Sequence, residues 1–171
     1  FNSSYTGGDG VQMCASTHPT DVGNQTNIIT AADLSETALE DLIIVVRKAT
    51  DARGRKIQLM PRSLNIPPDL EFEAGRILKS VLQNDTANNA INVIRATGAI
   101  PEGAKTNQFL TDTDAWFVRT NSRRGATVFE RDPLMFDEDN DFDTKNLKYA
   151  AYQRYSAGWS DWRGVFGSAG A

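Results

Sequence analysis

The chain has 171 residues, of which 40% are hydrophobic and 23% are charged, and its formal net charge at pH 7 is −4. This length allows one ordinary domain or two small lobes that share a core, and it excludes a large multidomain protein. The acidic balance argues against sequence-independent binding of DNA or RNA, because such binding depends on Lys and Arg side chains that neutralise phosphates.

The first part of the chain, from Phe1 to about Asn27, is rich in Ser, Thr, Gly and Asn and has few apolar residues. The run from Thr6 to Gly10 requires turns with positive φ, so we expect an ordered but irregular loop over residues 1–30. No Gly-Lys-Ser/Thr sequence follows these glycines, which argues against a phosphate-binding loop. The single cysteine, Cys14, cannot form an internal disulfide, and this suits assembly in a reducing cytoplasm.

Two segments carry apolar residues at helical spacing. The first predicts a core helix from about Ser35 to Thr50, with acidic residues near its start and basic residues near its end. The second begins after Pro67-Pro68, which suit a first helical turn, and predicts a helix to about Leu82. Between the two helices, residues 57–66 alternate as in a half-buried strand that Pro61 interrupts. We expect a turn at residues 84–89.

Short strands are expected in the second half of the chain. Residues 115–118 and 127–130 flank a turn-forming stretch at Asn121 to Gly125, and we interpret them as a hairpin. Arg123-Arg124 would then form a solvated basic spot at its tip. A long strand is expected from Thr144 to about Ala157. The order helix, strand, helix and then strands indicates an α+β fold without internal repeats.

The only histidine, His18, lies beside Pro19 in the polar N-terminal loop. A Ser-His-acid triad needs its imidazole on a rigid element, and no Gly-x-Ser-x-Gly nucleophile elbow is present. We therefore expect His18 to be structural or solvated. The sequence predicts no catalytic residue and no cofactor. The longest wholly apolar run, Leu42 to Val46, is far shorter than the roughly 20 residues that span a bilayer, so no membrane segment is expected.

The acidic run from Asp137 to Asp143 is the sharpest candidate for a metal site. A calcium loop that begins at Asp137 would need Gly at its sixth position and Glu at its twelfth, where this chain has Phe142 and Lys148. Like charges at this density repel one another, which favours an exposed turn between strands. We predict no metal ligand here, and weak binding of a divalent ion stays open.

Large aromatic residues gather near the end of the chain. Trp159 and Trp162 stand beside turn-forming glycines, a pattern that suits pinning a chain terminus or building an interface. Together with Tyr155 and Arg163, we take them as candidate anchors of folding or self-association. The alternative is an aromatic shelf that binds a sugar.

The segment from Tyr152 to Gly167 resembles the end of the major capsid proteins of tailed bacteriophages, especially the Mu-like major head subunit group. Other motifs of such proteins follow in the same order along nearly the whole chain: Thr6 to Gly10, Ser16 to Pro19, Ala32 to Thr37, Pro61-Arg62 with Pro67-Pro68, and Leu110 to Phe117.

This resemblance implies the Hong Kong phage capsid fold, with residues 31–128 mainly in an axial lobe and residues 129–171 as strands and a tail that return through a peripheral lobe. The family also carries an N-terminal arm, an extended loop and a spine helix, which we expect to lie upstream of Phe1 in a longer coat protein. The resemblance further implies a virion protein that forms hexamers and pentamers of an icosahedral head. Such a head is assembled in the host bacterial cytoplasm, with scaffolding, portal or decoration proteins as partners, and it encloses double-stranded DNA without specific binding.

Two other functions remain open from the residues alone. The first is a carbohydrate-binding or adhesion module that uses Trp159, Trp162 and Tyr155, with calcium at the acidic run. The second is a metal-dependent hydrolase that uses the same acids, against which the lack of ligand spacing argues.

Overall fold

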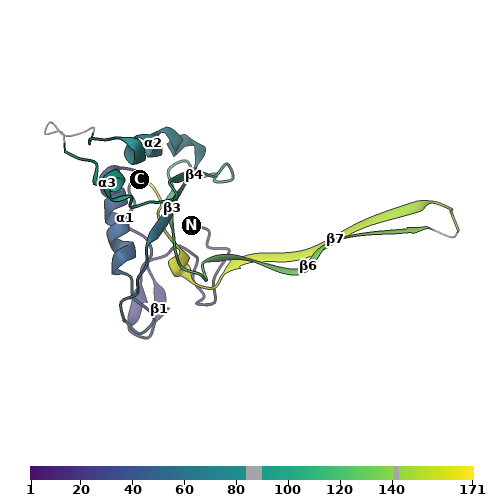
Figure 1. Cartoon of the computed structure of the whole chain (residues 1–171). Helices are drawn as coiled ribbons and strands as arrows, with labels where there is room; N and C mark the ends of the chain where they lie inside the picture. The colour runs from purple at the N-terminus through teal and green to yellow at the C-terminus, as the bar shows by residue number, and fades with distance from the viewer. Residues whose placement is uncertain (84–89, 141–142) are drawn as a thin grey trace.

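The computed structural model describes residues 1–83, 90–140 and 143–171. Figure 1 shows a body that holds the helices and a long two-stranded arm that projects from it. In chain order the elements are β1 (His18–Thr20), β2 (Gly23–Gln25), α1 (Glu36–Lys48), β3 (Pro61–Ile66), η1 (Pro68–Leu70), α2 (Glu71–Lys79), α3 (Val93–Thr97), β4 (Ala104–Thr106), β5 (Trp116–Thr120), β6 (Ala126–Asn140), β7 (Leu147–Trp159), η2 (Trp162–Gly164) and β8 (Val165–Ser168). This mixture of helices and strands agrees with the α+β class predicted from the sequence.

Helix α1 is the helix that the sequence predicts, and its ends follow from local chemistry. The Ser35 hydroxyl accepts a hydrogen bond from the Ala38 amide at 3.2 Å, which caps the first turn. Acidic Glu36 lies in that first turn and basic Arg47 and Lys48 lie in the last, so both ends complement the helix dipole. The apolar side of the helix supplies five buried residues to the core: Ala38, Leu39, Leu42, Ile43 and Val46.

The central sheet has the strand order β4, β3, β5, β8. Strand β3 pairs parallel with β4 and antiparallel with β5, and β8 pairs antiparallel with β5. Leu64, Trp116 and Phe166 come from three different strands and are almost fully buried in one cluster with the apolar side of α1. The core therefore lies between this helix and the sheet.

The predicted strand at residues 57–66 is shorter in the structure. Strand β3 begins at Pro61, and the pairing with β5 is irregular between Pro61 and Ser63. A proline has no amide hydrogen for the ladder and fits best at the first position of a strand. The second predicted helix also ends earlier than Leu82, because Ser80 leaves helical geometry and Leu82 instead bridges Ile91.

The hairpin predicted from residues 115–118 and 127–130 is wrong. Strand β5 pairs with β3 and β8 inside the body, whereas β6 pairs with β7 to form the arm. Two hydrophobic residues of β5, Trp116 and Val118, are fully buried, and the buried backbone of this strand finds its hydrogen-bond partners in β3 on one side and β8 on the other. Arg124 therefore does not lie at the tip of a hairpin. Its carbonyl instead accepts hydrogen bonds from the backbone amides of Ser160 and Asp161.

Three further expectations concern the long strand, the N-terminal loop and the turn at residues 84–89. The long strand expected from Thr144 is found as β7, Leu147–Trp159. The N-terminal loop is irregular as expected, except that β1 and β2 form a short antiparallel hairpin within it. The turn expected at residues 84–89 lies outside the described residues.

Candidate functional site

Asn27 joins the N-terminal loop to the last part of the chain. Its side chain is fully buried, and its amide nitrogen donates to the carbonyls of Met13 at 2.6 Å, Val165 at 2.8 Å and Trp162 at 3.2 Å. Its side-chain oxygen accepts from the Ala15 amide at 2.9 Å. Because every polar atom of this amide has a partner, Asn27 fixes two segments that lie 135 residues apart in the sequence.

His18 occupies the same cluster. It is fully buried on β1, with Nδ1 at 2.7 Å from an Asp9 carboxylate oxygen and Nε2 at 3.2 Å from the Asn27 side-chain oxygen. Its ring stacks on Trp162, with 4.4 Å between centroids and an interplanar angle of 7°. The expected polar loop is therefore a strand with a buried imidazole. No sequence motif links Asp9 or Asn27 to His18, and the sequence analysis missed both partners.

The carboxyl of Asp9 is adapted to this contact. Its partial burial by itself would raise its pKa, but hydrogen bonds from His18 and from the Val11 amide outweigh burial, and the net effect lowers the pKa below the ordinary value of 3.8. Asp9 is therefore a carboxylate at neutral pH. Burial raises the pKa of the Cys14 thiol to about 11 and outweighs the opposing charge of the N-terminus, so that side chain stays protonated and apolar.

Two of the four predicted anchors, Trp162 and Arg163, lie in this cluster. The Trp162 side chain is 8% exposed, and the Arg163 guanidinium carbon lies 4.2 Å from the centroid of its ring. Arg163 also donates to the Thr50 carbonyl at 2.8 Å and to the Gln25 side-chain oxygen at 3.0 Å, and it pairs with Asp161 at 3.3 Å. We call this group of residues, built around Asn27, His18, Trp162 and Arg163, the C-terminal hub.

The other two predicted anchors lie on the arm. Trp159 is half-buried at its base, opposite Ala126, and the backbone of Gly7 approaches its indole nitrogen so closely that a Cβ there would be 2.7 Å away. Tyr155 is 64% exposed and faces Glu130 across the ladder. Because Trp162 is buried in the hub, it cannot share an open sugar-binding shelf with Trp159. The role of all four residues as anchors stays a prediction.

The arm presents two chemically different faces. Side chains alternate between faces along β7, and ladder partners share a face. On one face, large apolar residues are 49 to 78% exposed; we call it the aromatic face, and it contains Val128, Phe136, Leu147, Tyr149 and Tyr155. The aromatic face also carries Glu130 and Glu138. The opposite face holds more charged residues, with Lys148 across from Asp139 and Arg154 across from Asp132, and it too exposes apolar side chains, namely Phe129, Met135 and Tyr152. Exposed apolar patches of this kind mark surfaces that contact a partner.

The acidic run is exposed, as the sequence predicts, and its end at Asp143 lies in a turn between β6 and β7, but its first part is a strand. Residues 137–140 belong to β6, and they pair in order with Ala150, Tyr149, Lys148 and Leu147. Strand alternation places Asp137 and Asp139 on one face and Glu138 on the other, so the carboxylates do not converge. The next two positions of the run lie outside the described residues. Over the described parts of the chain, no cluster of three or more His, Cys, Asp or Glu side chains could hold a metal ion.

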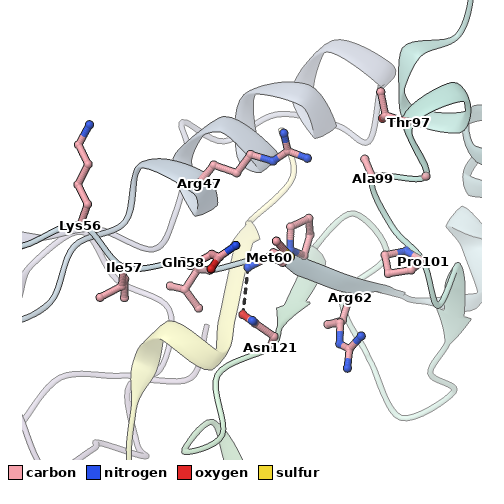
Figure 2. A pocket seen from close by; sticks show the side chains of 13 residues that line it. Arg47, Lys56, Ile57, Gln58, Met60, Arg62, Thr97, Ala99, Pro101 and Asn121 are labelled. Atoms are coloured by element: carbon pink, nitrogen blue, oxygen red, sulfur yellow. Dashed lines mark hydrogen bonds between the residues drawn. The ribbon is translucent and has the colours of Figure 1, made fainter.

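A groove of about 880 Å³ lies between the end of α1, the segment before β3 and the loop after α3. Its lining includes apolar Ile57 and Pro61 and cationic Arg47, Lys56 and Arg62, and it contains no acidic residue. Figure 2 shows these three cationic side chains pointing in different directions, so they do not converge on one anion. The groove alone therefore does not define a binding site. In the described residues no helix has the length and apolar character needed to cross a membrane.

A family model described as phage capsid protein matches residues 2–168. One similar solved structure is the virus-like particle from Pyrococcus furiosus, with 11% identity, a TM-score of 0.45, and coverage of 83% of this chain and 56% of that chain. Another is the satellite phage P4 procapsid including its size determination (Sid) protein, with 10% identity, a TM-score of 0.41, and coverage of 91% and 46%. The chain thus spans about half the length of these two chains. No curated protein matches it.

Proposed function

The chain belongs to the phage capsid protein family, and we propose that it acts by tiling with copies of itself into the shell of a virion. The observation that carries this proposal is the family match, because it covers residues 2–168 and so includes both the body and the arm. The role is structural, and the proposal assigns no catalytic residue and no cofactor.

The finer assignment is to the head of a tailed double-stranded DNA phage with the Hong Kong phage fold and a Mu-like subunit. In this proposal residues 31–128 act mainly as the axial lobe of a hexamer or pentamer, and residues 129–171 supply peripheral strands and the tail. Strand β8 pairs with β5 in the body sheet, so the tail would link the two lobes. Scaffolding, portal or decoration proteins would bind during assembly in the bacterial cytoplasm.

The surface chemistry supports such a role. A shell needs many modest contacts, because interfaces of about −4 to −8 kcal/mol correspond to roughly millimolar to micromolar affinity and still allow errors to be corrected. Multiplicity then makes the assembly permanent. The aromatic face of the arm offers apolar surface for such contacts, and the net charge of −4 limits adhesion to the enclosed genome.

Electron microscopy of the full-length coat protein, with the segments expected upstream of Phe1 and expressed together with a scaffolding protein, tests the proposal. We expect shells or capsomers, and persistent monomers under all such conditions would reject it. Tyr149→Lys places a charge on the aromatic face, where the side chain is 73% exposed, and we expect it to reduce assembly without loss of folding. Tyr152→Lys, on the opposite face, is the control; because it also removes the hydroxyl that donates to Asp132 at 3.5 Å, both variants are first compared for folding. Equal loss in both variants would contradict a specific role of the aromatic face.

A further inference from the structure

Basic residues gather around the groove that lies beside the end of α1. Over residues 47–62 the chain has six Lys or Arg residues and one acidic residue, although the net charge of the whole chain is −4. Three of these basic residues, Arg47, Lys56 and Arg62, line the groove, and Met60 is 49% exposed among them. The groove thus combines apolar surface with positive charge, and its volume is near the top of the usual range for a binding cleft.

The far end of the arm has the opposite charge. Over residues 137–148 the chain has five acidic residues and two lysines. On the aromatic face, Glu138 lies directly opposite Tyr149 and two positions from Phe136, and these two aromatic residues are 73% and 78% exposed. We call this end of the arm, with these three residues, the acidic tip. Its carboxylate between apolar rings complements the cationic and apolar lining of the groove.

The acidic tip lies far from the groove of its own chain. The ladder of the arm runs from Ala126 at the base to Asn140 at the tip, a length of about 45 Å at about 3.3 Å per residue. Figure 1 shows the arm extending away from the body that holds α1 and β3. An acidic tip that enters the groove therefore belongs to another molecule.

We propose that the acidic tip of one copy docks in the cationic groove of a neighbouring copy. This inference rests on the proposed shell function, because it names a contact that links neighbours in the shell. The two surfaces differ, so the contact is heterologous, and each copy offers one groove and one tip. Contacts of this kind join copies head to tail, and they close into a ring where the rotation between neighbours permits.

An acidic polypeptide fits this groove better than a nucleic acid does. Figure 2 shows Arg47, Lys56 and Arg62 pointing in different directions, whereas a phosphate group is held by donors that converge on it. Cations that are spread apart suit carboxylates that are spread apart as well. Strand alternation separates the three acidic side chains of residues 137–139 onto the two faces of the arm. The apolar residues of the groove and of the tip then bury one another.

Charge reversal in the full-length coat protein, with the segments expected upstream of Phe1, tests the contact. Lys56→Glu in the groove and Glu138→Lys at the tip should each lower the yield of shells about tenfold or more, because each brings like charges together. The double variant opposes the reversed charges and should assemble better than either single variant. A double variant that assembles no better than the poorer single variant would overturn the contact.

The matched controls are Lys48→Glu and Glu130→Lys. They make the same charge changes at exposed positions, the first outside the groove lining and the second on the aromatic face toward the base of the arm. Both controls should assemble as the wild type does. Equal losses in the controls and in the test variants would contradict a specific contact, because only the net charge would then matter.

Cross-linking locates the contact without relying on loss of assembly. Gln58→Cys places a thiol in the groove of one chain, and Asn140→Cys places one at the tip of another. In mixed shells treated with an oxidant, mass spectrometry should identify the disulfide between these two positions. Ala157→Cys, near the base of the arm, should give no such link to the groove. Cys14 is buried and has a pKa raised to about 11, so it should not compete.

The outcomes separate this contact from the shell function. Shells that form without the cross-link would overturn the contact and leave the shell function standing, whereas a wild type that never assembles would reject both. Normal assembly of Lys56→Glu with weaker retention of duplex DNA would assign the groove to nucleic acid and overturn the proposal.

Discussion

The joint between the arm and the body can be tested at a contact between two glycines. A Cβ built on Gly164 would lie 2.4 Å from the Cα of Gly125, and one on Gly125 would lie 2.9 Å from the Cα of Gly164. Ordinary carbon contacts are about 3.5 to 4.0 Å, so Gly164→Ala requires these backbones to separate by about 1 Å. The atoms in the way are main chain, which cannot turn aside as a flexible side chain would.

We expect Gly164→Ala to lower the free energy of unfolding by about 3 kcal/mol, the upper part of the usual range for overpacking, because two buried segments must move apart. The control is Gly158→Ala on β7, where nothing lies within 4 Å of an added Cβ, and its expected effect is within about 0.5 kcal/mol. Urea denaturation compares the midpoints, provided that the slopes agree. A Gly164→Ala midpoint equal to that of Gly158→Ala would refute the close contact.

Four further outcomes follow from the packing and charges. Trp162→Ala should cost about 3 to 5 kcal/mol of unfolding free energy in urea denaturation, whereas exposed Tyr155→Ala should cost less than about 1; equal losses would contradict the split between hub and arm. Ser63→Ala should stabilise the fold by up to about 1 kcal/mol, because among the described residues its buried hydroxyl has no hydrogen-bond partner; a loss of stability would reveal one. Cys14, which is buried and has a pKa raised to about 11, should react with a thiol reagent only after denaturation, and prompt reaction in the native state would refute its burial. Because the pKa of Asp9 is lowered, the stability that its carboxylate contributes is complete above the ordinary value of 3.8 and is lost as the pH falls below that value. Below about pH 4 the free energy of unfolding should therefore fall more steeply with acid in the wild type than in Asp9→Asn, and parallel curves would contradict this contribution.

Helices α1 and α2 were the most predictable part of the fold, because their signals are local, whereas the short helix α3 was not predicted. The spacing of apolar residues and the cap at Ser35 are both contained within one stretch of sequence, and α1 follows them to within two residues at either end. The end of α2 was less predictable. Its apolar pattern continues to Leu82, but the bridge to Ile91 takes that residue away from the helix.

Strand pairing could not be predicted in the same way. Alternation identifies a strand and its buried side, but it does not identify the neighbour across the ladder. The turn-like stretch at residues 121–125 suggested that β5 and β6 form a hairpin, although β6 in fact pairs with a strand that begins after residue 146. Trp116 and Val118 alternate along β5 and are fully buried in the structure, but the strands that flank β5 come from distant parts of the sequence.

The sequence indicated that the aromatic residues near the end of the chain act as anchors. It did not indicate that Trp162 and Arg163 lie in the hub while Tyr155 and Trp159 lie on the arm. Trp162 and Arg163 enter the hub because Asn27 and His18 approach from the first part of the chain, and such long-range hydrogen bonds leave no spacing pattern. The burial of His18 between two hydrogen-bond acceptors could not be predicted either, because the polar residues around it in the sequence favour a loop. Burial depends on tertiary structure, and a single sequence contains only its local part.

The arm and the body differ in how far their residues are buried. A two-stranded hairpin alone is marginally stable in water, yet β6 and β7 extend from the body with almost every residue exposed. Their base is held, since the Arg124 carbonyl accepts from Ser160 and Asp161, while large apolar side chains farther along face solvent. These bonds thus join the two strands at the base of the arm just before the chain enters the hub, and the arm presents apolar surface that is exposed in this structure. A subunit whose stability resides in its body and whose apolar surface resides in its arm is suited to form further contacts with other copies without refolding.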